Sequence, residues 1–224
     1  MTSSAPLALY GGTFDPVHAA HVAAARAVAA ALGGPVHLLP NAVPPHRPQP
    51  YASPAQRLAM LQLAAADAPE LKVDDWELRQ PGPSYTLATL EHFRQHIGPE
   101  RPLVWVVGAD SFASLHHWHR WQHYPALCHL AVLPRPGAAA ADPAVAAAFT
   151  SADAAALRGQ PAGLRLMLTA PCLEHSSTAI RTALAAGQRH PGLDAGVADF
   201  IYREGLYNAR HLPTLDRNSQ DSHD

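Results

Sequence analysis

Short apolar runs of strand length alternate with longer segments of helical period along most of this chain. This alternation is typical of a parallel sheet, because two parallel strands need a crossover between them that is usually a helix. The sequence therefore predicts an α/β fold with a doubly wound, mainly parallel sheet and helices on both faces. The predicted strands are residues 6–10, 36–40, 71–74, 103–107, 129–133 and 164–168.

Three helices are indicated by their end signals. Glycines stop the first and third helices, while the second starts at a serine cap followed by proline and, three positions after the cap, by glutamine. The helices are expected from about His18 to Leu32, from Ser53-Pro54 onward, and from about Thr86 to Ile97.

The length of 224 residues, 48% of them hydrophobic, is enough for one substantial core. We expect a single domain over residues 1–207. Within it, residues 134–163 are rich in Ala, Pro and Gly, which suggests a surface excursion with short helices before the sheet resumes. Residues 208–224 are polar and are expected to form a disordered tail.

Charge and cysteine content narrow the class of partner. The formal charge of −2 and the absence of a basic run argue against a nucleic-acid footprint, so a small ligand is favoured. Cys128 and Cys172 are far apart and indicate neither a disulfide framework nor a zinc site. Charges or prolines interrupt every long apolar stretch, and no Lys or Arg precedes Arg26, so we expect a cytoplasmic protein without membrane contact.

Two common phosphate-binding loops do not fit. Lys72 is the only lysine, and no glycine precedes it, which excludes a P-loop. A dinucleotide fingerprint needs a different glycine spacing and an acidic residue after the second strand, where this chain has Asn41. A redox enzyme with a nicotinamide cofactor therefore stays only as an alternative.

The segment after the first predicted strand favours another kind of phosphate site. Gly11-Gly12 is expected to form a turn, and the helix behind it starts with His18 and His21. Residues three apart share a helix face, so both imidazoles can donate to one anion at the positive end of the helix.

A second helix start carries matching chemistry. Ser176-Ser177-Thr178 precedes an apolar helix as a cap and leaves unpaired N–H groups for a docking anion. Arg181 follows Ser177 by one helical turn and can reach the same anion. The two helix starts could clamp a triphosphate between them.

Several motifs in order resemble those of the bacterial nicotinate-nucleotide adenylyltransferase family, in the adenylyltransferase branch of the nucleotidyltransferases. The resemblance covers about residues 6–207 and implies a Rossmann-like fold. Two positions depart from the family pattern: Ala20 replaces a glycine, and His175 replaces an apolar residue. The motifs are residues 11–16 with His18 and His21, residues 40–47, 84–86 and 108–111, Trp118, and residues 135–137, 176–181 and 204–207.

The resemblance implies transfer of AMP from ATP to nicotinate mononucleotide, which gives nicotinate adenine dinucleotide and pyrophosphate by direct in-line attack. It implies Mg²⁺ bound mainly through the ATP phosphates, and no metal-binding side chain is expected. The implied catalytic residues are His18, His21 and Arg181. ATP and its phosphates are expected at Gly11, Gly12, Thr13, Phe14, His46, Arg47, Gly108, Asp110, Arg135, Ser177, Thr178 and Ile180. Nicotinate mononucleotide is expected at Asp15, Asn41, Thr86, Trp118 and His119.

Some alternatives stay open at this point. The first motif also fits an adenylyl- or cytidylyltransferase acting on another phosphorylated acceptor, such as phosphopantetheine, and the fold also fits a catalytically silent nucleotide-binding regulator. The sequence does not decide between nicotinate and nicotinamide mononucleotide. Histidines 116, 117, 119 and 123 are interpreted as a solvated histidine-rich helix, because no further metal ligand stands in register with them.

Overall fold

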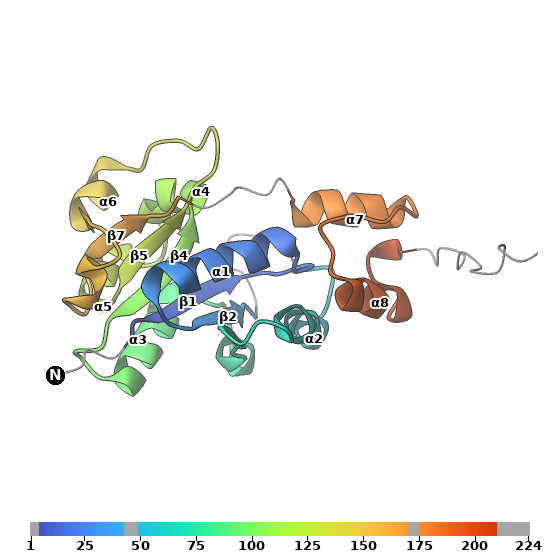
Figure 1. Ribbon diagram of the computed structural model, residues 1–224, viewed down its shortest axis with the longest axis horizontal. Coiled ribbons are helices and arrows are strands. Elements are labelled where there is room, and N and C mark those ends of the chain that lie inside the picture. Colours follow the sequence, from blue (N-terminus) through green and yellow to red (C-terminus); the bar gives the residue numbers. More distant parts are fainter. Residues whose placement is uncertain (1–4, 43–48, 170–174, 210–224) are drawn as a thin grey trace, which may run out of the picture.

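The computed structural model describes residues 5–42, 49–169 and 175–209. In these ranges, parallel strands form one seven-stranded sheet in the order β3-β2-β1-β4-β5-β7-β6, with helices on both faces (Figure 1). The fold is α/β and Rossmann-like, as the sequence predicts. The strands are β1 (Leu7–Gly12), β2 (Val36–Pro40), β3 (Leu71–Val73), β4 (Leu103–Gly108), β5 (His129–Leu133), β6 (Thr150–Ser151) and β7 (Leu164–Met167).

The helices include all those expected from the sequence, together with several that it did not indicate. Short 3₁₀ turns lie at residues 76–79, 115–117, 121–123, 156–158 and 206–208. No helix in the described ranges is long and apolar enough to cross a membrane. The α-helices are α1 (Ala19–Leu32), α2 (Pro54–Ala65), α3 (Thr86–Ile97), α4 (Ala109–Ala113), α5 (Tyr124–Leu127), α6 (Pro143–Ala148), α7 (Ser177–Ala185) and α8 (Ala195–Arg203).

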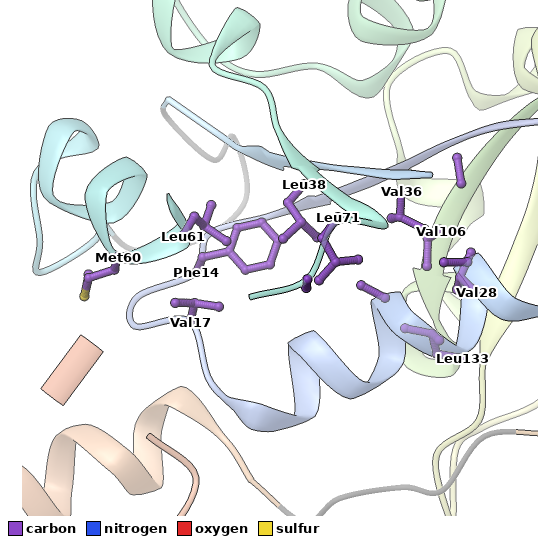
Figure 2. Packing of buried hydrophobic residues seen from close by; sticks show 14 of the residues in the cluster. Phe14, Val17, Val28, Val36, Leu38, Met60, Leu61, Leu71, Val106 and Leu133 are labelled. Carbon is purple, nitrogen blue, oxygen red and sulfur yellow. The ribbon is translucent and has the colours of Figure 1, made fainter. Parts of the chain in front are cut away.

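Two hydrophobic cores lie on opposite faces of the sheet. Along β4, Val104 and Val106 face one core while Leu103, Trp105 and Val107 face the other, as the two-residue period of a strand requires. The first core packs against α1, α2, α7 and α8, and the second packs against α3, α4 and α6. Figure 2 shows part of the first core, with the buried ring of Phe14 among its aliphatic side chains.

The glycine turn expected at Gly11-Gly12 is wrong, because both glycines belong to β1. Gly11 pairs with Leu39 and Gly12 pairs with Pro40 of β2. The chain turns only afterwards, and Phe14 there has a positive φ of 50°. Glycine at these positions permits close packing in a strand, which a pattern of turn-forming residues does not reveal.

The expected helix ends are confirmed. The Ser53 hydroxyl accepts from the Gln56 backbone N–H at 3.3 Å, and the Gln56 side chain accepts from the Ser53 N–H at 3.0 Å, which completes a capping box. Helix α1 ends at Gly33, which has the left-handed backbone typical of a helix stop.

Residues 134–163 contain short helices and also contribute to the body of the protein. Strand β6 from this segment pairs with β7 at the edge of the sheet. The side chains of Val145, Phe149 and Leu157 are fully buried, so this segment returns to both cores.

Candidate active site

A pocket of about 1080 Å³ opens where parallel strands β1, β4 and β5 end. Strands β1 and β4 are neighbours although β1 also pairs with β2, so the chain reverses its direction of travel across the sheet at this point. Ligands of open α/β sheets bind at such a switch point. The start of α1, the start of α3 and the start of α7 complete the wall.

Most of the residues expected at the ligands line this one pocket. His46 and Arg47 lie outside the described residues. Asp15, Ile180 and Arg181 are not among the described residues that line the pocket, and their contacts are given below. The expected residues that line the pocket are Gly11, Gly12, Thr13, Phe14, His18, His21, Asn41, Thr86, Gly108, Asp110, Trp118, His119, Arg135, Ser177 and Thr178.

The glycines that line the pocket differ in what surrounds them. A Cβ at Gly11 would lie 2.6 Å from the Trp105 ring, and one at Gly12 would lie 2.9 Å from the Phe14 ring, so packing alone excludes a side chain there. At Gly108, no described atom lies within 4 Å of a Cβ built there. Gly108 therefore leaves open space at the pocket, which a ligand could fill.

His18 and His21 form a stacked pair at the start of α1. Their ring centroids are 3.7 Å apart, and the backbone N–H of His18 donates to Nδ1 of His21 at 3.3 Å. A neutral His21 that accepts at Nδ1 carries its proton on Nε2, where it serves as a donor. His18 is 7% exposed, and its Nδ1 is buried without a hydrogen-bond partner among the described residues.

Burial keeps both imidazoles neutral at physiological pH. Burial, followed by repulsion from His175 and His190, lowers the pKa of His18 to about 4. Burial, followed by the charge of His18, also lowers the pKa of His21. At neutral pH these residues therefore offer N–H donors, and a bound anion would favour their protonation.

Helix α7 is fixed to the turn that precedes α1. Ser177 donates its hydroxyl to the Pro16 carbonyl at 3.0 Å, and Arg181 donates to the Asp15 carbonyl at 2.7 Å. The Arg181 guanidinium also donates to the Thr178 hydroxyl at 3.2 Å. The N-termini of α1 and α7 thus border the same pocket, and the Arg181 guanidinium contacts it through the Thr178 hydroxyl.

Asp15 supports the site from the interior. Its buried carboxylate accepts from the backbone N–H groups of Tyr51 at 2.8 Å and Ala52 at 3.0 Å, and from the hydroxyl of Tyr207 at 2.7 Å. Burial raises the pKa of Tyr207, so this phenol stays a donor. Because these three groups occupy the carboxylate, Asp15 does not face the pocket as the expected contact with nicotinate mononucleotide would require. Ile180 is likewise fully buried in the core.

Arg57 is a supporting residue that sequence reasoning missed. Its side chain is fully buried and donates to the carbonyls of Thr13 at 2.8 Å and Ala42 at 3.3 Å. It thereby joins the loop after β1 to the loop after β2. The signal was present in α2, where Arg57 stands one turn before Met60 and Leu61 on the apolar face.

The far end of the pocket is aromatic and polar. The rings of Tyr85 and His119 lie 4.6 Å apart beside Trp118, which also lines the wall. Glu77, which sequence reasoning also missed, lines this end with a buried carboxyl group that accepts from the Thr89 hydroxyl at 2.7 Å. Burial raises the pKa of Glu77. No periodic pattern marked this residue, because it lies in a 3₁₀ turn.

The carboxylates near the pocket are already engaged by protein groups. Asp110 forms an ion pair with Arg135 at the rim, and Asp15 and Glu77 hold the contacts given above. In the described part of the chain, no three His, Cys, Asp or Glu side chains are arranged to hold a metal ion. The donor set therefore fits a cation that arrives on a polyphosphate better than one held by the protein.

A parallel α/β fold with a pocket between two helix N-termini suits a nucleotidyltransferase, and sequence comparisons identify that class. The profile of the Cytidylyltransferase-like family matches residues 9–183. A protein of Marinobacter nauticus named "Probable nicotinate-nucleotide adenylyltransferase" is 43% identical over 208 residues, covering 90% of this chain and 96% of that protein. One of Serratia proteamaculans with the same name is 44% identical over 212 residues, covering 89% and 94%. The chain belongs to the nicotinate-nucleotide adenylyltransferase family.

Solved structures show the same fold at low sequence identity. Nicotinic acid mononucleotide adenylyltransferase of Plasmodium falciparum, complexed with NaAD, superposes with a TM-score of 0.70 at 15% identity. The match covers 92% of this chain and 98% of that one. The same enzyme complexed with APC gives a TM-score of 0.67 at the same identity and coverage.

Proposed function

We propose that this protein transfers AMP from ATP to nicotinate mononucleotide, giving nicotinate adenine dinucleotide and pyrophosphate in NAD biosynthesis. The observation that carries the proposal is the convergence of the α1 and α7 N-termini on one pocket, with His18 and His21 at the first of them. Two helix N-termini suit a polyphosphate, since each presents unpaired N–H groups and partial positive charge.

The ATP end of the pocket binds the phosphates through neutral donors. His18 and His21 donate to the α-phosphate, and the α7 N-terminus with Ser177 and Thr178 holds the β- and γ-phosphates. Arg181 acts as a positioning residue, because it fixes the Asp15 carbonyl and the Thr178 hydroxyl. His46 and Arg47 stay proposed as further phosphate ligands.

The nucleoside part of ATP lies over the β4 end of the pocket. The open space at Gly108 permits close approach by the ligand, and Asp110 with Arg135 borders it at the rim. The acceptor lies at the far end, with the pyridine ring on Trp118 and with Thr86, Asn41 and His119 around it.

The reaction is a direct displacement at phosphorus. A phosphate oxygen of the mononucleotide forms a bond to the α-phosphorus as the bond to the bridging oxygen of pyrophosphate breaks. Catalysis rests on positioning and on hydrogen bonds that strengthen as charge develops. Mg²⁺, which we propose enters with ATP, neutralises phosphate charge, and no side chain is assigned to it.

The remaining parts of the proposal concern organisation and location. Residues 1–207 form one nucleotidyltransferase domain, and the protein works in the cytoplasm. The tail expected at residues 208–224 lies, from residue 210 onward, outside the described residues. The single sheet formed by all seven described strands supports the one-domain organisation.

Pyrophosphate release tests the function. The protein is incubated with MgATP and, in turn, with nicotinate mononucleotide, nicotinamide mononucleotide and phosphopantetheine at matched concentrations. We expect the fastest release with nicotinate mononucleotide and formation of the dinucleotide product. Release only with phosphopantetheine would favour another acceptor, and ATP binding without release from any acceptor would indicate a silent regulator.

A further inference from the structure

Two further histidines stand beside the α1 N-terminus. His175 immediately precedes Ser176, the N-cap of α7, and lines the pocket. Its ring centroid is 5.4 Å from that of His190, with an angle of 79° between the ring planes. Both imidazoles are close enough to His18 for their charges to repel its proton.

The loop from His190 to Gly192 makes room for this arrangement. A Cβ at Gly192 would lie 2.8 Å from Cγ of His175, so the ring occupies the space that any side chain there would need. The Gly192 carbonyl accepts from the N–H of Ala19, the first residue of α1, at 2.8 Å. His190 in turn accepts the Gly192 N–H at its Nδ1 at 3.0 Å. The loop therefore holds His175 against the start of α1.

The chemistry of the cluster points to a multiply charged anion. Imidazoles that repel one another's protons gain little from a weak anion, whereas a polyphosphate can compensate several of them at once. His18, which is only 7% exposed, lines the pocket wall. Its Nδ1 is buried and has no hydrogen-bond partner among the described residues. A buried unsatisfied donor or acceptor is costly unless a ligand or water completes it.

We infer that His175 is an additional phosphate-binding residue, which donates to the β- or γ-phosphate of ATP and to the departing pyrophosphate between the α1 and α7 N-termini. The inference rests on the proposed function and extends it to a residue that the other motifs do not include. The other imidazoles of the cluster are His18 and His21 at the start of α1 and His190 in the 190–192 loop, and the charged side chain on α7 is Arg181.

Binding measurements without turnover provide the test. The full-length protein is titrated separately with ATP, inorganic pyrophosphate and nicotinate mononucleotide. His175→Phe keeps an aromatic ring against His190 but removes both ring nitrogens. We expect it to weaken the affinities for ATP and pyrophosphate about tenfold, the scale of one charge-assisted hydrogen bond, and to leave nicotinate mononucleotide unaffected.

Two more variants separate the donor from the packing. His175→Asn keeps a hydrogen-bond donor and should retain more ATP affinity than His175→Phe. If His175→Phe has a lower Tm than the wild type, the comparison of His175→Asn with the wild type serves as the test. His123→Phe removes an exposed histidine from another part of the chain and should match the wild type. Unchanged ATP and pyrophosphate affinity in both His175 variants, or equal weakening of all three ligands, overturns the inference.

Measurements on the wild type distinguish failure of the His175 inference from failure of the proposed function. If the wild type binds ATP and releases pyrophosphate while the His175 variants bind as it does, only the role of His175 is wrong. If the wild type binds neither ATP nor pyrophosphate, the proposed function is wrong, and the inference fails with it.

Discussion

The Trp105 indole fills the space beside Gly11, where a Cβ would come within 2.6 Å of Cη2 and 2.8 Å of Cζ2 of its ring. Trp105 is 3% exposed, so its ring has little freedom to move aside. Because residue 11 has no side chain, the Trp105 ring can lie beside Gly11 while strands β1 and β4 stay paired.

Gly11→Ala should lower the free energy of unfolding by about 1–3 kcal/mol, the usual cost of overpacking a core. Urea denaturation measures the change. Gly108→Ala is the matched control, since no described atom lies within 4 Å of its Cβ. It should leave stability unchanged and weaken ATP binding, because the new methyl group occupies ligand space. Equal unfolding midpoints for wild type and Gly11→Ala would refute the packing argument.

His18→Ala should lower kcat roughly 100-fold while the KM for nicotinate mononucleotide changes little. The reason is that its N–H contact with the α-phosphate strengthens as charge develops in the transition state. Steady-state kinetics with saturating ATP separates the two constants. Alanine at the exposed His117 is the control and should behave as wild type. Near-normal turnover of His18→Ala would remove His18 from the mechanism.

Arg181→Ala should raise the KM for ATP, because the α7 N-terminus loses its ties to the Asp15 carbonyl and the Thr178 hydroxyl. Arg181→Lys should rescue little, since one ammonium group cannot reproduce the fork that makes both contacts. Alanine at the exposed Arg189 controls for lost charge on the same part of the chain. A KM for ATP in Arg181→Ala that equals the wild-type value would show that these contacts do not position the helix.

Tyr207→Phe should lower the free energy of unfolding by about 1–2 kcal/mol, because the buried Asp15 carboxylate loses its phenol donor at 2.7 Å. Thermal or urea unfolding measures this loss. Tyr51→Phe removes a hydroxyl from a side chain that is 75% exposed and should cost much less. If the two variants are equally stable, the Asp15 contact contributes nothing.

The stability of the protein without ligand should fall as the pH drops from about 6.5 toward 4. The pKa of His18 is about 4 in the folded state and about 6.5 in the unfolded state. As the pH falls, His18 therefore becomes protonated in the unfolded chain before it does so in the folded protein. The unfolded state binds more protons throughout this window, and stability therefore rises with pH across it. At pH 5 the expected loss from His18 is about 2 kcal/mol. His18→Ala should flatten this part of the pH profile of unfolding. An unchanged profile would show that His18 does not cause the pH dependence.

Six of the seven strands could be predicted, because each lies in a short, mainly apolar run in a chain that otherwise has helical period. Strand β6, which consists of the two exposed polar residues Thr150–Ser151, has no such run and was not predicted. The sequence could not show that Gly11 and Gly12 belong to β1, since the reason lies in the rings of Trp105 and Phe14. Helix α8, which was not predicted, nevertheless has local signals in the sequence: Asp194 caps it, and Val197 and Ile201 stand one turn apart.

The pocket wall was predictable and its support was not. Residues such as His18 and Thr178 are marked by local motifs at helix starts. The partners of Asp15, by contrast, include Tyr207, 192 positions away, and no local pattern joins them. Arg181 shows the same limit, because its spacing from Ser177 indicates the correct helix face but not that the Asp15 carbonyl takes up the guanidinium.

The contacts that fix α7 link positions 161 and 166 residues apart, from Ser177 to Pro16 and from Arg181 to Asp15. During translation, the α1 end of the site therefore leaves the ribosome long before its α7 counterpart. A nascent chain that stops short of Arg181 can build strands β1 to β7 and still lacks one wall of the nucleotide pocket. Nucleotide affinity should thus appear late in synthesis, as a property of the nearly finished polypeptide.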